Sequence, residues 1–128
     1  MLDDDMAGVV HPKLRACEAF VIATPIYYFG PSAQTKLFLD RWYALGGQEG
    51  EPHALRGKRV AVALTYADPD PFSSGAANAM AIFRDAIRWV EARLVGVVYG
   101  SAEAAGEIAQ NEAVIQQARE LGGRLAGE

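Results

Sequence analysis

Three short stretches of the chain are almost continuously apolar and lack the polar–apolar alternation of a strand exposed on one face. They are residues 19–24 (AFVIAT), 59–66 (RVAVALTY) and 93–99 (RLVGVVY). Strands covered on both faces, as in a parallel sheet, have this pattern. We therefore expect three buried strands.

A helical pattern follows each of these stretches. Pro31 and Ser32 supply start signals for the first helix, which the glycines at 46 and 47 stop, and Ser73 or Ser74 can cap the second. The third helix ends at Gly127. The spacing of apolar positions predicts these inward faces: Leu37, Phe38, Arg41, Trp42 and Leu45 in the first helix; Ala79, Ile82, Phe83, Ala86, Ile87 and Val90 in the second; Val114, Ile115, Ala118, Leu121 and Leu125 in the third.

A further helix is expected before the first strand, capped by one of the aspartates at 3–5, with Met6, Val10, Leu14 and Cys17 inward. Pro12 either kinks this helix or marks the place near which it begins. One helix followed by three strand–helix units predicts an α/β doubly wound domain over residues 1–128. The segment 46–58 is the one long loop in this interpretation.

Composition narrows the class of protein. A length of 128 residues suits one domain, and a net charge of −4 provides no basic surface for nucleic acid. No apolar run reaches the roughly 20 residues that span a membrane, and the acidic first residues differ from a signal peptide. The single cysteine, Cys17, excludes an internal disulfide or a cysteine metal cluster within one chain. We expect a cytoplasmic protein without nucleic-acid or membrane partners.

Candidate chemistry lies directly after the first strand, because ligands of open parallel sheets bind at the carboxyl ends of the strands. Residues 24–42 read TPIYYFGPSAQTKLFLDRW, with three aromatic rings beside Gly30 at the start of a helix. Free N–H groups at a helix start favour an electron-rich or anionic ligand. Aromatic rings and free amides suit a flavin ring; a buried aromatic turn is the alternative.

This stretch resembles the NADPH-dependent FMN reductase and iron–sulfur flavoprotein branch of the flavodoxin-like families. DDM at residues 4–6, TPIYY at 24–28 and SAQ at 32–34 correspond to the family's DDM, SPVYF and SAQ. The tail GEI…QARELGGRLA is also similar to the last helix of the family. Further matches are Lys36, Asp40 and Arg41, which we expect to hold the helix and a subunit contact.

The resemblance implies a flavodoxin-like three-layer α/β/α fold, FMN as cofactor and NAD(P)H as electron donor. It also implies a small-molecule acceptor such as a flavin or quinone. A homodimer or homotetramer is expected for another reason, because an uncovered apolar strand at 19–24 invites pairing with another chain. In the family the turn after this strand wraps the flavin, and the loop after the next strand faces it. We assign no catalytic residue and no metal site. The cofactor-binding residues that we expect are Thr24, Pro25, Ile26, Tyr27, Tyr28, Phe29, Gly30, Thr65, Tyr66, Ala67, Asp68 and Gly75.

The family pattern also has a first strand and a phosphate-binding loop before its DDM segment, and the sequence has only three residues there. In the flavodoxin strand order 2-1-3-4-5 we therefore expect an N-terminally incomplete sheet of about three core strands, with residues 19–24 as an open edge. Loss of two hydrogen bonds to the phosphate would weaken FMN binding about 10²–10⁴-fold. The alternative function is a truncated, non-catalytic module that self-associates or completes a partner's sheet.

Other polar residues receive plainer interpretations. Pro69 and Pro71 make an exposed turn the better interpretation of Asp68 and Asp70 than a metal site. The two histidines, at positions 11 and 53, are expected on the surface, and Cys17 as a small buried hydrophobe.

Overall fold

The computed structural model describes residues 4–127. Its helices and strands follow the expected order along the chain. They are α1 (His11–Ala16), β1 (Ala19–Tyr27), β2 (Gly30–Pro31), α2 (Ala33–Asp40), β3 (Arg59–Tyr66), α3 (Ala76–Trp89), β4 (Arg93–Ser101) and α4 (Glu112–Ala126). Short turns of π- and 3₁₀-helix lie at Met6–Val10, Arg41–Leu45 and Glu107–Gln110.

The sheet has the strand order β2-β1-β3-β4, and β1, β3 and β4 run parallel. The register pairs Pro25 with Thr65 and Thr65 with Gly100, so the carboxyl ends of the three strands meet at one edge. The three expected strands are confirmed. β1 and β4 run further than predicted, and β2 is an additional short strand that pairs antiparallel with the end of β1.

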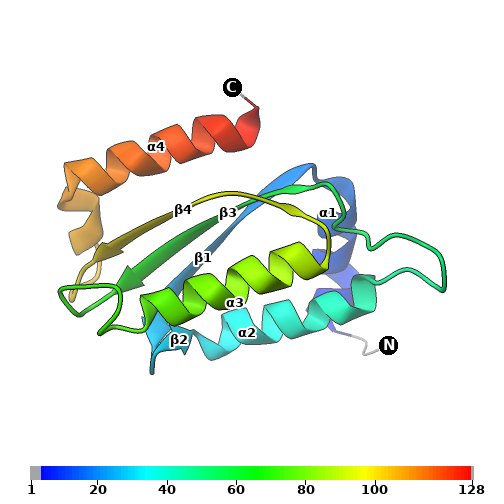
Figure 1. Cartoon of the computed structure of the whole chain (residues 1–128), viewed down its shortest axis with the longest axis horizontal. Coiled ribbons are helices and arrows are strands. Elements are labelled where there is room, and N and C mark those ends of the chain that lie inside the picture. The colour runs from blue at the N-terminus through cyan, green and yellow to red at the C-terminus, as the bar shows by residue number, and fades with distance from the viewer. Residues whose placement is uncertain (1–3, 128) are drawn as a thin grey trace.

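The elements form three layers, with α2 and α3 on one face of the sheet and α4 on the other (Figure 1). Successive side chains of β3 point to opposite faces of the sheet, so the strand contributes to a hydrophobic core on each face. Val62 and Leu64 pack with Phe83 of α3, whereas Ala61 points to the other face and packs with Leu121 of α4. The apolar periods of α3 and α4 therefore face the sheet as predicted.

The predicted helix ends are confirmed only in part. The helix after β1 ends at Asp40, and a 3₁₀ turn continues to Leu45 before the glycines at 46 and 47. Ser32 caps α2, since its hydroxyl accepts from the Thr35 amide at 3.3 Å. The cap of α3 is Gly75 in a left-handed conformation; Ser74 instead accepts from the Ala76 amide inside the first turn. Leu37 was expected inward but is exposed, because the buried face of α2 and the following turn is formed by Leu39, Trp42 and Leu45.

The segment before β1 resolves the alternatives for Pro12. Residues Met6–Val10 form a π-helical turn, and the α-helix begins at His11, with Pro12 in its first turn. Asp4 accepts from the Ala7 amide at 2.9 Å and forms an ion pair with Arg41. The Arg41 guanidinium lowers the pKa of the Asp4 carboxyl to about 2. Asp3, another cap candidate, lies outside the described residues.

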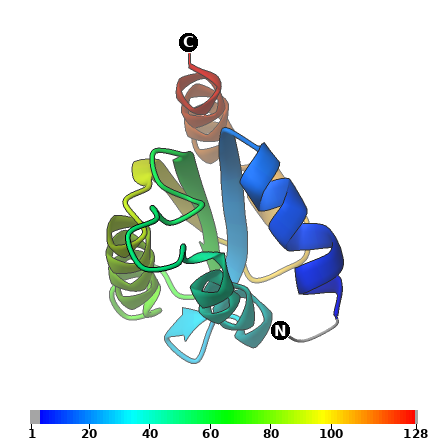
Figure 2. The same cartoon turned by 90° about the vertical axis from the view of Figure 1, so that its right-hand side faces the viewer.

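The outer edge of β1 is open among residues 4–127, apart from the short pairing of Ile26 and Tyr27 with β2. The prediction that β1 is covered on both faces is only partly confirmed, because Ile22 is buried but Val21 is 55% exposed. The reason is that α4 lies mainly over β4 and β3. α1 lies at the β1 end of the sheet (Figure 2), where Leu14 joins the core with Ile22 and Trp42.

The expected surface position of the histidines is wrong for His11, which is 4% exposed, and only partly right for His53. The His53 ring is half-buried, accepts from the Leu55 amide at 3.1 Å and bonds the Trp42 carbonyl at 3.1 Å. Cys17 is half-buried, with its thiol directed at the Leu14 carbonyl. Between residues 4 and 127, no helix has the length and apolar character to cross a bilayer.

Candidate functional site

The aromatic stretch at the end of β1 forms a tight hairpin with β2. Tyr27 pairs with Gly30, so Tyr28 and Phe29 are the two turn residues. Both have positive φ, at 47° and 65°, a combination typical of type I′ hairpins and usually supplied by Asn and Gly. Such a conformation costs a bulky residue on the order of 1–3 kcal/mol. The rest of the structure must therefore hold this turn in place.

The base of the hairpin is held by a buried hydroxyl. Thr24 is 4% exposed, and its Oγ1 accepts from the Ser32 amide at 3.2 Å and donates to the Pro25 carbonyl at 2.9 Å. Ser32 is also the cap of α2. Hydrogen bonds between Thr24 and Ser32 therefore connect the two strands of the hairpin with the start of α2.

The tip of the hairpin rests on the start of α3. Gly75 faces the backbone of Phe29, and the Asn78 side-chain amide donates to the Phe29 carbonyl at 3.4 Å. The loop after β3 and the loop after β1 are therefore joined by direct contacts.

A pocket of about 440 Å³ opens at the carboxyl ends of the parallel strands. We call it the strand-end pocket. Its three walls are residues 25–27 at the end of β1, residues 65–67 at the end of β3 and residues 102–106 after β4, with Ile108 behind the third wall. The volume lies in the range of about 300–1,000 Å³ typical of cofactor and small-molecule sites.

Half of the predicted site residues line this pocket, and the others support it or lie outside it. Thr24 is buried at the hairpin base, and Gly75 lies at the start of α3. Tyr28 and Phe29 are 99% and 60% exposed, so the aromatic turn is not sealed in the core. Gly30 lies in β2 and Asp68 in the exposed turn that follows β3. The predicted residues that line the pocket are Pro25, Ile26, Tyr27, Thr65, Tyr66 and Ala67.

The third wall was missed by the sequence interpretation. Residues 102–106 (AEAAG) carry no aromatic or basic side chain and attracted no attention as a motif. Their place follows from the register, because the ends of β1, β3 and β4 meet at one edge. The signal that could have found them is the rule that ligands bind outside these strand ends.

The electrostatics of the strand-end pocket favour an uncharged ring over an anion. Neither Lys nor Arg is among its lining residues, and Glu103 is its one acidic side chain. Burial raises the pKa of the Tyr66 phenol, and Tyr99 and Asp70 add to the effect, so this wall stays neutral at physiological pH. Asp70 itself caps the exposed turn by accepting from the Phe72 and Ser73 amides, and its bonds with Ser73 lower its pKa.

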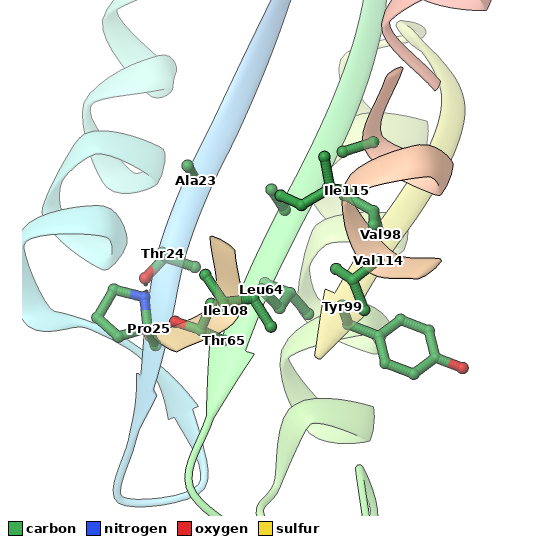
Figure 3. Close-up of a pocket in the computed structure, with 12 residues that line it drawn as sticks. Ala23, Thr24, Pro25, Leu64, Thr65, Val98, Tyr99, Ile108, Val114 and Ile115 are labelled. Carbon is green, nitrogen blue, oxygen red and sulfur yellow. Dashed lines mark hydrogen bonds between the residues drawn. The ribbon is translucent and has the colours of Figure 1, made fainter. Parts of the chain in front are cut away.

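A second cavity, of about 360 Å³, lies between α4 and the sheet, and we call it the apolar groove (Figure 3). Val98, Val114 and Ile115 are among its walls, and Pro25, Thr65 and Ile108 are shared with the strand-end pocket. The ring of Tyr99 points away from the other lining side chains in Figure 3. A polar cofactor would find few groups here to orient it, so we take the strand-end pocket as the candidate site.

Comparisons with known proteins agree with this geometry. The sequence model of a family described as NADPH-dependent FMN reductase matches residues 2–106. A Bacillus subtilis protein named as an NAD(P)H-dependent FMN-containing oxidoreductase is 42% identical over 41 residues, which are 32% of this chain and 22% of that relative. The match thus spans less than a quarter of the relative's length.

Solved structures show the same architecture. The Trp repressor binding protein from Bacillus subtilis is 25% identical with a TM-score of 0.78, over 94% of this chain and 71% of that one. General stress protein 14 from Treponema denticola, solved in complex with FMN, is 22% identical with a TM-score of 0.66, over 97% of this chain and 73% of that one. The flavodoxin-like fold is therefore confirmed. Because the family match covers most of the sequence, the chain belongs to the NADPH-dependent FMN reductase family.

Proposed function

We propose that this chain binds FMN in the strand-end pocket and works as an NAD(P)H-dependent oxidoreductase of the flavin or quinone reductase type. The observation that carries the proposal is the pocket itself, because one of its walls, residues 25–27, leads directly into the strained aromatic turn at Tyr28 and Phe29. Hydrogen bonds at Thr24 and Asn78 hold the base and the tip of this hairpin. Strain held by its surroundings is characteristic of binding and active sites. Membership of the family supports the same conclusion.

The residues present fit the ring of FMN. Tyr27 offers an aromatic face that is 63% exposed, and residues 65–67 and 102–106 offer backbone at the opposite walls. Small side chains in the third wall leave the backbone accessible to a flat ring. A phosphate finds no basic side chain among the lining residues. We therefore expect ring contacts to supply most of the affinity.

Bound FMN would accept a hydride from the nicotinamide and pass electrons to the acceptor. The chain's own part is to bind and to exclude water. The ends of β1 and β3, with the residues that follow them, form two sides of the pocket, and Tyr66, which is 7% exposed, is among the lining residues. Proton transfer by a dedicated acid or base is not part of the proposal.

The test is an FMN titration of the purified protein, followed by absorbance and fluorescence, and then oxidation of NADH and of NADPH with a quinone as acceptor. Saturable binding with donor oxidation supports the proposal. Absence of binding at high micromolar FMN contradicts it.

A second candidate is a sheet-completing or self-associating module without catalysis. The feature that favours it is the outer edge of β1, which is open among residues 4–127 and uncharged from 19 to 23. An open edge of this kind invites pairing with another chain. Stable association without flavin binding would favour this candidate over the enzyme.

The proposal includes a homodimer or homotetramer in the cytoplasm. Exposed Tyr43 and Trp89, at 84% and 71%, flank a surface cavity and support self-association. The need for NAD(P)H favours the cytoplasm. Equilibrium sedimentation at micromolar concentration distinguishes a monomer from either oligomer.

A further inference from the structure

The third wall of the strand-end pocket is shaped by a side chain that lies outside it. Glu107 follows the 102–106 loop, and its carboxylate accepts from the backbone amides of Glu103 and Ala104 at 2.7 and 2.9 Å. The Glu107 amide in turn donates to the Ala104 carbonyl at 3.2 Å. This reciprocal arrangement closes the loop into a ring.

The neighbours of Glu107 fix the same loop from both sides. Gly106 adopts a left-handed φ of 79°, which allows the chain to reverse before Glu107. Ile108 packs against β4 so closely that a Cβ on Gly100 would lie 2.6 Å from its Cδ1. Figure 3 shows Ile108 together with Pro25 and Thr65, the residues shared by the two cavities.

The loop is also tied to the second wall. The Ala102 amide donates to the Tyr66 carbonyl at 2.8 Å, and the Ser101 hydroxyl donates to the Ala67 carbonyl at 3.3 Å. One end of the loop is therefore held by β3, and the other end by the Glu107 carboxylate. Without that carboxylate, the amides of residues 103 and 104 would lose their hydrogen-bond acceptor. The middle of the loop would then no longer be held in one conformation.

We propose that Glu107 is a positioning residue for the cofactor, holding the 102–106 wall at the spacing that a flavin ring requires. The inference rests on the proposed FMN binding and assigns a role to a residue that does not line the pocket. Charge-assisted hydrogen bonds suit this role, because they are stronger than neutral ones. The two amides lower the pKa of the Glu107 carboxyl, in agreement with a carboxylate that stays ionised in place.

The experiment compares FMN titrations of wild type, Glu107→Ala, Glu107→Gln and Glu112→Ala. Glu112 is an exposed glutamate in the first turn of α4 and is the matched control, since its substitution removes the same charge nearby. We expect Glu107→Ala to raise the FMN dissociation constant about tenfold, equivalent to about 1.4 kcal/mol. Glu107→Gln keeps an acceptor oxygen and should recover most of the affinity, and Glu112→Ala should remain close to wild type.

Two further readouts separate positioning from general stability. Hydrogen exchange at the amides of residues 103 and 104 should accelerate in Glu107→Ala, and the visible circular dichroism of bound flavin should change. If Glu107→Ala unfolds, Gly106→Ala gives an independent test, because a Cβ there meets no atom within 4 Å but strains the loop backbone.

The outcomes are distinct. Wild-type affinity in Glu107→Ala, or failure of Glu107→Gln to recover binding, overturns the positioning role alone. Absence of FMN binding in the wild type overturns the proposed function, and the positioning role with it.

Discussion

Gly75 and Phe29 approach so closely that a Cβ on Gly75 would lie 2.3 Å from the Phe29 Cα. Gly75 also has a positive φ of 82°. Glycine is therefore required at this position for two independent reasons, backbone conformation and space. The contact joins the tip of the aromatic hairpin to the start of α3 and sets the relative position of two loops beside the candidate site.

Gly75→Ala should destabilise the protein and weaken FMN binding, because the hairpin tip must move. We expect a loss of about 1–3 kcal/mol in the free energy of unfolding, measured by urea denaturation. Gly57→Ala is the matched control: Gly57 has a φ of 76°, but a Cβ added there would meet no atom within 4 Å. Equal effects of the two substitutions would show that the contact with Phe29 contributes nothing.

Relief of the strained turn should stabilise the fold, and the same variant tests whether the rings of Tyr28 and Phe29 contact the cofactor. Asn and Gly prefer the conformation held by Tyr28 and Phe29, so the double variant Tyr28→Asn, Phe29→Gly should gain roughly 1 kcal/mol in the free energy of unfolding. FMN affinity should fall if these rings contact the cofactor. Tyr43→Asn removes another exposed ring, 84% accessible, and serves as the control. A variant that is both less stable and equally able to bind FMN would contradict this account.

The hydroxyl of Thr24 should matter more than its methyl group. Thr24→Val keeps the shape but leaves the buried Ser32 amide without its acceptor, which typically costs about 1–3 kcal/mol. Thr24→Ser keeps the hydroxyl and should lose about 1 kcal/mol or less for the missing methyl. Thermal and urea unfolding of both variants measure the difference. If Thr24→Ser proved less stable than Thr24→Val, the hydrogen bond between the Thr24 hydroxyl and the Ser32 amide would not be what stabilises the base of the hairpin.

The ion pair of Asp4 and Arg41 predicts a pH dependence of stability. The pKa of Asp4 is lowered from 3.8 to about 2 in the folded protein, first by its hydrogen bond with Arg41. The group therefore contributes stability that is present above pH 3.8 and is lost as the pH falls through about 2. Asp4→Asn should be less stable at neutral pH, and its difference from wild type should shrink over this window. A difference that stays constant from pH 5 to pH 2, measured by chemical denaturation, would exclude the ion pair as its cause.

The local pattern of apolar residues was sufficient to predict those elements that are buried along their whole length. The limits of β3 coincide with the predicted ones because residues 59–66 are apolar almost throughout and covered on both sides. β1 was predicted too short, because the strand passes through Pro25 and continues to Tyr27. A missing amide is tolerated at the edge of a sheet.

Other features depend on neighbours that are distant in sequence. The burial of His11 depends on the packing of α1 beside the sheet, which no local pattern encodes. The third wall presents mainly backbone and small side chains, so its composition gave no signal. Its place at the site follows from the register, which puts Gly100 beside Thr65, and from the rule that ligands bind outside the strand ends. Residues with distinctive chemistry, such as Tyr27, could be assigned to the site from the sequence; the groups that position them could not.

The three walls of the strand-end pocket come from segments far apart in the chain, at 25–27, 65–67 and 102–106. No fragment that lacks one of these strands can form the complete cavity. A molecule that fills it binds only when all three parallel strands are paired, and it therefore shifts the equilibrium toward the fully assembled sheet by mass action. Resistance to denaturant would then rise with ligand concentration across the whole domain, so that a global unfolding curve also serves as a binding assay.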